Sequence, residues 1–390
     1  MLPNFISHKH PQVGVDILFD SRYLNTDGIV TCCPGSVFEG SVKVKTSIPI
    51  PISHIKIVFK ATERVNYDAM GWKKSKADDV RLFAIRNILW GLPATSTDGD
   101  SSPVYHILEA GDYAFPFTCQ LPMINYPPTL QHHLIATAFN IVVSVVKAND
   151  SVSKTFPVYF QPIIETLLLR PKYTEEHKLS QRISAIVTVP KLAYNINERN
   201  KSIPVKVQLY TDNQENIHIS HLCVYIKKCF KIKYKTCTKN EDTVVASYDH
   251  VKIPTTCPSN LSLKLDLPDS AELFPATLDY SPYLTIQYKL VVTVKIRHGP
   301  INFKKKIFDT PVIFGTLPVG MTAPRQLESY SDIKENTASI HCKPTFLKPQ
   351  LKETLEEENL PAYDSIGKPP SYTIVSGRNS SYSMGSVTVA

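Results

Sequence analysis

This 390-residue sequence predicts an all-β fold of two tandem antiparallel β-sandwiches, followed by a disordered C-terminal tail. Apolar and polar residues alternate with a period of two along residues 12–318, whereas a helical period of 3.6 persists nowhere in that range. The composition, with 30 prolines and 19 tyrosines against 14 glycines, favours strands and turns over helices. Sheets without intervening helices are expected to be antiparallel and packed face to face.

The first sandwich is predicted over residues 12–160. Its strands carry an apolar residue at every second position, so one face of each strand is buried and the other faces water. These apolar positions are Val13, Val15, Ile17 and Phe19, then Ile55, Ile57, Phe59 and Ala61, and later Phe139, Ile141, Val143 and Val145. Two stretches, residues 68–79 and 87–103, are polar or rich in turn-forming residues, and we expect them to be loops.

The second sandwich is predicted over residues 161–318, because the alternation starts again after a break. Its longest alternating run comprises Ile286, Tyr288, Leu290, Val292, Val294 and Ile296. After Pro318 the alternation stops, and Ser, Thr, Glu, Lys and Pro accumulate. Such a composition buries too little apolar surface to offset the entropy lost on ordering, so residues 319–390 are expected to form a disordered tail.

Positive charge is concentrated in the predicted sandwiches. The formal net charge is +8, and residues 319–390 hold seven Lys or Arg against eight Asp or Glu, which leaves +9 for residues 1–318. This excess suggests an acidic partner, such as phospholipid head groups or phosphorylated protein, although most surface lysines simply solvate a fold, and that simpler interpretation is the favoured one. The lysines proposed to contact acidic lipid or cargo are Lys73, Lys74, Lys76, Lys304, Lys305 and Lys306.

Export and membrane insertion have no support in the sequence. The first residues lack the basic start and apolar run of a secretion signal. The longest apolar stretches fall far short of a membrane span. We therefore expect a soluble cytoplasmic protein with reduced thiols.

Catalytic and metal chemistry also lack a recognisable motif. The eight cysteines form no CxxC pair, and no GxSxG, P-loop, HExxH or GxGxxG arrangement is found. His132-His133 and Cys32-Cys33 are isolated doublets, which we expect to pack or to be solvated. The sequence therefore predicts no enzyme, no catalytic residue, no metal, no cofactor and no nucleic-acid partner.

Six segments share their order and spacing with one known family. In the first predicted sandwich they are residues 34–42 (PGSVFEGSV), 55–61 (IKIVFKA) and 111–117 (GDYAFPF), the last followed by Leu121-Pro122. In the second they are residues 202–207 (SIPVKV), 283–290 (YLTIQYKL) and 311–316 (PVIFGT). The set resembles the arrestin family, and with its tail the chain is similar to the arrestin-related trafficking adaptors, or α-arrestins. The resemblance implies the arrestin fold, in which these segments are structural.

The predicted tail contains Pro369, Pro370, Ser371 and Tyr372, a PPxY motif. Consecutive prolines preset a polyproline helix that fits the aromatic groove of a WW domain, and the tyrosine fills a neighbouring pocket. A degenerate copy lies nine residues upstream and is expected to be a weaker, auxiliary WW-binding site. It consists of Leu360, Pro361, Ala362 and Tyr363, with leucine where the family's motif has proline.

The resemblance implies a non-enzymatic adaptor. Its sandwiches would hold a membrane transporter or receptor, and its tail would recruit a WW-domain HECT-type ubiquitin ligase, so that the cargo is ubiquitinated, endocytosed and sorted. The cytoplasmic protein would be recruited peripherally to the plasma membrane or endosomes. Two alternatives stay open: a retromer-type endosomal sorting subunit, which acts by stable assembly, and a receptor-desensitising arrestin, which needs a buried charge network that senses phosphate.

Overall fold

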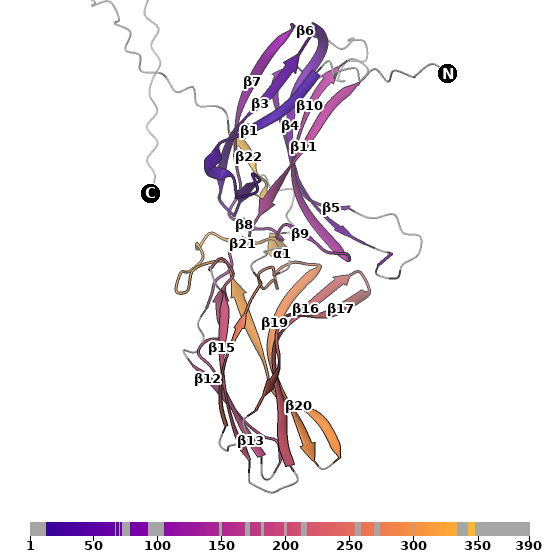
Figure 1. Cartoon of the computed structure of the whole chain (residues 1–390). Helices are drawn as coiled ribbons and strands as arrows, with labels where there is room; N and C mark the ends of the chain where they lie inside the picture. The colour runs from indigo at the N-terminus through magenta and orange to yellow at the C-terminus, as the bar shows by residue number, and fades with distance from the viewer. Residues whose placement is uncertain are drawn as a thin grey trace, which may run out of the picture. The chain divides into compact units, whose positions relative to one another are not determined.

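The computed structural model of the chain consists almost entirely of strands (Figure 1). Two short helices interrupt them, the 3-10 helix η1 (Ser21–Tyr23) and α1 (Tyr330–Ile333). The structure describes residues 13–66, 68–69, 71, 79–92, 105–147, 150–167, 172–180, 183–198, 201–211, 217–253, 259–268, 274–298, 300–333 and 342–347. No helix among these residues has the length and apolar run needed to cross a bilayer. The predicted all-β class is confirmed.

Two sheets form the first sandwich. The smaller has the order β1-β3-β7-β22, with strands Val13–Phe19, Val37–Thr46, Gly111–Gln120 and Thr345–Leu347. The larger has the path β2-β11-β10-β4-β5, with strands Val30–Cys32, Ser151–Phe160, Ile135–Lys147, Ile50–Val65 and Asp79–Gly91. Two short strands join its margins, β6 (His106–Leu108) on β4 and β9 (Leu130–Gln131) on β10.

Two further sheets form the second sandwich. The smaller has the order β12-β13-β15-β18, with strands Tyr173–Lys178, Ile183–Val189, Ser202–Thr211 and Ser259–Asp266. The larger has the order β14-β20-β19-β16-β17, with strands Ala193–Asn195, Ile301–Gly315, Leu284–His298, Ile217–Tyr234 and Cys237–Lys252. Pairing in the four sheets is antiparallel except at the short strands β2 and β14, which lie parallel to β11 and β20.

The two sandwiches repeat one strand topology. In chain order, β1, β2, β3, β4, β5, β7, β10 and β11 correspond to β13, β14, β15, β16, β17, β18, β19 and β20, and each set gives the same neighbours. Each smaller sheet then gains one strand, β22 beside β7 in the first sandwich and β12 beside β13 in the second. These additions lie at opposite edges of the repeated sheet.

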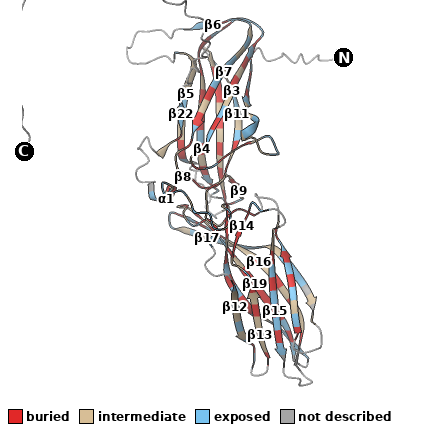
Figure 2. Cartoon of the chain, turned by 90° about the vertical axis from the view of Figure 1, so that its left-hand side faces the viewer, coloured by how far each residue is buried: buried red, intermediate tan, exposed pale blue. Residues whose placement is uncertain are grey.

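Each sandwich encloses its own apolar core, as Figure 2 shows by the buried residues that alternate along the strands. Ile55, Ile57 and Phe59 on β4 are fully buried, in agreement with the predicted alternation. Phe59 meets Phe38 of the opposite sheet edge to face, with ring centroids 5.7 Å apart. Contact between side chains of different sheets is what makes the pair a sandwich, because each sheet buries one face against the other.

The same layering holds in the second sandwich. Val205 of the smaller sheet and Val292 of the larger are both fully buried in one cluster. Tyr173 on β12 meets Phe308 on β20 edge to face, with centroids 5.8 Å apart. The added strand β12 therefore contributes to the core as well as to the hydrogen-bonded ladder.

One predicted loop is partly wrong. Residues 87–91 were expected to belong to a loop, but they continue β5 along β4. Ile55 pairs with Trp90 and Lys56 with Ile88, so Leu89 is an extra residue in a β-bulge. The bulge breaks the period of two, and this is why the strand was not recognised from its alternation.

The chain after Pro318 returns to the first sandwich. β21 (Glu328–Ser329) pairs in parallel with β8 (Ile124–Asn125), and Tyr330 is buried in the first core, 5.5 Å from the ring of Tyr126. The Tyr126 hydroxyl donates a 2.6 Å hydrogen bond to the carbonyl of Cys342. A tail boundary at residue 318 is therefore too early for the described residues 319–333 and 342–347, because one buried tyrosine and a ladder anchor them.

The segment that links the sandwiches is held from both sides. Asn125 of the first sandwich bonds Ile163 twice: its side-chain amide donates to the carbonyl at 2.7 Å, and its side-chain oxygen accepts from the backbone N–H at 2.9 Å. Thr316 of the second accepts from the N–H of Ile164 at 2.8 Å and donates to the carbonyl of Pro162 at 2.8 Å. These bonds satisfy backbone groups that would otherwise be buried without partners.

Gly315 has to be glycine because the linking segment passes directly over it. A Cβ there would lie 2.3 Å from the Thr166 hydroxyl oxygen and 2.8 Å from the Glu165 carbonyl oxygen. Both separations are shorter than a carbon atom tolerates. This close approach explains why β20 ends with a glycine.

Candidate functional site

Most of the residues singled out in the sequence lie outside the described part of the chain. These are the motif Pro369, Pro370, Ser371 and Tyr372, its degenerate copy Leu360, Pro361, Ala362 and Tyr363, and the lysines Lys73, Lys74 and Lys76. Their roles remain predictions. The second lysine run, Lys304 to Lys306, lies on β20.

Lys304, Lys305 and Lys306 do not form one free basic patch. The Lys305 ammonium donates a 2.7 Å hydrogen bond to the carbonyl of Leu179, and that of Lys306 lies 2.5 Å from a carboxylate oxygen of Asp309. Lys304 is exposed, and its ammonium lies 5.8 Å from the centre of the Tyr225 ring. Two of the three charges are thus engaged by the protein itself, which reduces what they can offer to a partner.

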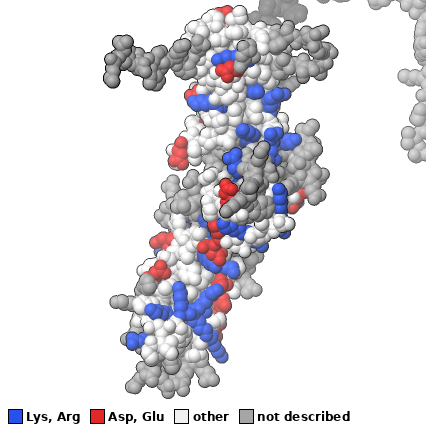
Figure 3. Space-filling model, turned by 90° about the vertical axis from the view of Figure 1, so that its right-hand side faces the viewer, with Lys and Arg blue, Asp and Glu red and all other residues white. Residues whose placement is uncertain are grey.

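Basic side chains do gather on the second sandwich, as the face drawn in Figure 3 shows, with acidic side chains beside them. Lys304 is paired across the ladder with Lys295. Like charges in opposed positions repel and destabilise the strand pair slightly. An acidic partner would relieve that repulsion, so Lys304 and Lys295 are the better candidates for such a contact.

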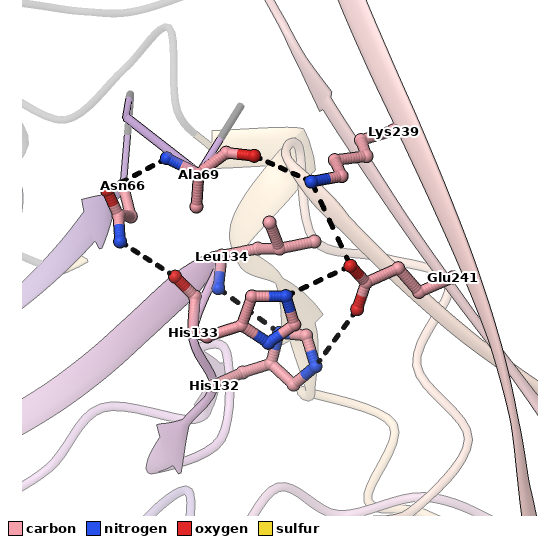
Figure 4. Close-up of polar contacts among 7 residues, drawn as sticks. All are labelled: Asn66, Ala69, His132, His133, Leu134, Lys239 and Glu241. Carbon is pink, nitrogen blue, oxygen red and sulfur yellow. Dashed lines mark hydrogen bonds and ion pairs between the residues drawn. The ribbon is translucent and has the colours of Figure 1, made fainter. Parts of the chain in front are cut away.

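A second group of polar side chains, which includes the doublet His132-His133, lies where the sandwiches meet. A two-residue hairpin joins β9 to β10: the backbone N–H and carbonyl of His132 pair with those of Ile135. This turn places His132 and His133 next to each other, with ring centroids 4.3 Å apart. Both rings reach the β16–β17 hairpin of the second sandwich (Figure 4).

The carboxylate of Glu241, on β17, lies close to both imidazole rings. Its two carboxylate oxygens lie 2.9 Å from Nε2 of His133 and 3.7 Å from Nε2 of His132 (Figure 4). The His132 ring stacks on Phe230 at 4.0 Å and is 18% exposed, whereas His133 is 58% exposed. Glu241 is 26% exposed. The cluster is therefore partly shielded from water, which strengthens its electrostatic interactions.

Backbone and amide contacts fix the surroundings of the cluster. The Asn66 side chain donates to the carbonyl of His133 at 2.9 Å and accepts from the N–H of Ala69 at 3.3 Å. The Lys239 ammonium donates to the carbonyl of Ala69 at 2.6 Å and lies 3.9 Å from the carboxylate of Glu241. Hydrogen bonds thus connect three parts of the chain: the segment with Asn66 and Ala69, the turn with the two histidines, and the β16–β17 hairpin.

Burial lowers the pKa of His132 below its usual value of 6.5, and the neighbouring His133 lowers it further, while Glu241 acts in the opposite direction. Burial also lowers the pKa of Lys228. The backbone N–H of Leu134 donates to Nδ1 of His132 at 3.3 Å. That nitrogen is therefore an acceptor, and the proton of the neutral ring sits on Nε2, facing Glu241.

His132 packs on Phe230 and His133 is largely exposed, as expected, but the doublet is not isolated, because both rings lie beside Glu241. Glu241 follows it by more than a hundred residues, and only the register of β16 with β17 brings the carboxylate to the turn. Two imidazoles and a carboxylate that converge can exchange a proton, hold an ion pair or bind a metal ion. The histidine doublet was a signal, but its partner could not be read from spacing.

Neither a family model nor a curated protein matches this sequence. Functional assignment therefore depends on the residues of the chain itself.

Proposed function

We propose that this chain is a non-enzymatic adaptor of the arrestin-related kind, which recruits a WW-domain HECT-type ubiquitin ligase through Pro369-Pro370-Ser371-Tyr372 and presents to it a membrane transporter or receptor. The cargo would then be ubiquitinated, endocytosed and sorted. In this proposal the sandwiches act as a scaffold, and no step requires a catalytic residue or a cofactor of this chain.

The position of the motif is the observation that carries the proposal. The last described strand, β22, ends at Leu347, and the motif begins 22 residues later. A segment of that length spans at most about 80 Å when fully extended. A ligase bound to the motif would be tethered to the sandwiches by a segment of at most that length.

Tethering explains how a short motif would suffice. A PPxY peptide offers few contacts, so its affinity for one WW domain is limited. When the same adaptor also holds the cargo, the encounter of ligase and cargo becomes intramolecular, and the effective concentration rises by orders of magnitude. Lys304 and Lys295 would add an electrostatic contact with acidic groups of lipid or cargo, and this contact would weaken as the salt concentration is raised.

A peptide titration tests ligase recruitment. A peptide spanning residues 359–376 would be titrated into a WW domain of a HECT ligase, alongside versions with Tyr372→Ala and Tyr363→Ala. We expect Tyr372→Ala to abolish measurable binding, because the tyrosine pocket is left empty, and Tyr363→Ala to weaken it at most severalfold. The second variant is the matched control, since it changes the same residue type in the degenerate copy.

No binding by the unaltered peptide would remove ligase recruitment and favour a retromer-type sorting subunit, which uses the double sandwich in a stable assembly. A receptor-desensitising arrestin would instead require a buried charge network. Glu63 is a buried carboxylate, and Thr137 donates to it at 3.4 Å. Binding of a phosphorylated receptor peptide that is lost in Glu63→Gln would favour that alternative.

A further inference from the structure

We propose that His132, His133 and Glu241 form a zinc site that joins the two sandwiches. The site is independent of the proposed ligase recruitment. Two of its ligands come from the turn between β9 and β10, and the third comes from β17. A zinc ion bound there would connect the first sandwich to the second by coordination bonds in place of the contact between His133 and Glu241.

The spacing of the three ligand atoms suits a small tetrahedral ion. Zinc binds histidine nitrogen and carboxylate oxygen at about 2.0–2.2 Å, so ligand atoms of a tetrahedral site lie roughly 3.3 Å apart. The Nε2 of His133 lies 2.9 Å from one oxygen of Glu241, and the Nε2 of His132 lies 3.7 Å from the other. One ligand atom from each of the three residues lies within 4.8 Å of the other two. Coordination therefore needs the three side chains to draw together by at most about 1.5 Å from that limit.

The ligand set points to zinc among divalent ions. Calcium and magnesium prefer oxygen ligands, whereas two imidazoles and one carboxylate are a ligand set that zinc uses when it keeps one position for water. His133 is largely exposed, which leaves room for that water. The position of His132 is fixed by its stack on Phe230, so little side-chain entropy is lost on binding.

Zinc binding requires the Nε2 proton of each ring to move, because the Glu241 carboxylate only accepts hydrogen bonds and the Nε2 of His133, 2.9 Å away, therefore also carries a proton in the metal-free site. In the metal-free ring of His132 the proton is on Nε2, because Nδ1 accepts from the N–H of Leu134. When Nε2 binds zinc, the proton moves to Nδ1 and the Leu134 contact is lost. That contact is long, at 3.3 Å, so its loss costs little beside the new coordination bond.

Two lysines oppose the ion and provide a test of the site. Lys239 lies 3.9 Å from a carboxylate oxygen of Glu241, and the charge of Lys228 acts on His132. A divalent cation placed among the three ligands is repelled by both ammonium groups. Removing the charge of Lys239 should therefore tighten zinc binding, an effect that a site elsewhere in the chain would not show.

The test is a zinc titration of the metal-stripped, reduced full-length chain, with affinity measured by calorimetry and the melting temperature recorded with and without zinc. We expect one zinc per chain at this site and a rise in melting temperature. Glu241→Gln and His133→Ala should each weaken binding tenfold or more and remove the thermal shift. Lys239→Met should tighten it severalfold. The exposed His106→Ala is the matched control and should change nothing.

Three results would overturn the proposal: no saturable zinc binding by the unaltered chain, binding that survives both Glu241→Gln and His133→Ala, or binding that Lys239→Met leaves unchanged. The second would assign the ion to cysteines instead. Cobalt makes that distinction visible, because a nitrogen-and-oxygen site lacks the sulfur-to-metal charge-transfer absorption of a thiolate site.

Discussion

The two sandwiches share one eight-strand topology, but they extend their smaller sheets at opposite edges and from different sources. The second uses β12, which directly precedes β13 in the chain. The first uses β22, whose Thr345 pairs with Gln120 after the whole second sandwich has intervened. A strand from a sequence neighbour closes a short loop, whereas β22 closes a very long one, at a greater entropic cost.

The difference shows which sandwich depends on the C-terminal segment. Tyr330 lies in the core of the first sandwich, and the Tyr126 hydroxyl bonds to Cys342. No such dependence is needed by the second sandwich, whose repeated strands and added strand all lie within residues 173–315. Variants that act on one sandwich and spare the other will test this asymmetry.

The largest effect is expected for Tyr330→Ala. The side chain is 2% exposed, and truncation of a buried aromatic residue costs about 3 kcal/mol or more. Native-state hydrogen exchange should show that loss in the amides of β7 and β10, while β19 and β20 keep their protection. Tyr330→Phe keeps the ring and should cost under about 1 kcal/mol. Equal loss in both sandwiches would refute the asymmetry.

Next in size are two variants that release the linking segment from either side, Asn125→Ala and Thr316→Val. Each leaves buried backbone groups of the linker without partners, at a cost of about 1–3 kcal/mol in the free energy of unfolding. Urea denaturation should give similar losses for the two. Thr174→Val, at an exposed hydroxyl, should stay within about 0.5 kcal/mol. A loss confined to one variant would mean that only that sandwich holds the linker.

A smaller effect concerns pH and the first sandwich. Burial, with Lys56 and Arg86 as lesser causes, lowers the pKa of His54 below 6.5. The unfolded chain therefore takes up this proton first, so stability is complete above about pH 6.5 and falls as the pH drops toward the folded pKa. Urea denaturation at pH 7.5 and 5.5 should show a smaller difference for His54→Gln than for the unaltered chain. An identical difference would contradict this assignment.

The smallest effect is expected in the second sandwich, at the turn between β16 and β17. Lys235 has a φ of 51°, a left-handed conformation that costs a side-chain-bearing residue about 1 kcal/mol and costs glycine nothing. Lys235→Gly also loses the contact of its ammonium with the Tyr234 ring, at 5.1 Å, so a net gain of about 0.5 kcal/mol is expected. Thr236→Gly, in the same turn, should destabilise instead, and thermal melts compare the two.

Period-two alternation predicted both sandwiches, because successive side chains of a strand point to opposite faces, so a buried face shows as an apolar residue at every second position. Ile55, Ile57 and Phe59 are buried as expected. The alternation failed at residues 87–91, where the extra Leu89 shifts every later side chain to the other face. It also failed at β22, where three residues are too few to show a period.

The junction cluster could not be predicted, since its members lie on separate hairpins. His132 and His133 were visible as a doublet, but Glu241 reaches them only through a register with β16 that includes bulges on β17. The spacing of the three residues along the chain does not indicate that Glu241 lies beside the two histidines. In contrast, the motif at Pro369–Tyr372 is readable from sequence alone, because a short extended peptide needs no tertiary partner of its own chain.

The most direct test of the adaptor proposal compares the WW-domain affinity of the full-length chain with that of the peptide spanning residues 359–376. If β22 anchors the chain only as far as Leu347 and the motif is available beyond it, the two affinities should agree within about twofold, and Tyr372→Ala should abolish both. A full-length chain that does not bind, beside a peptide that does, would contradict an adaptor whose ligase motif is permanently available.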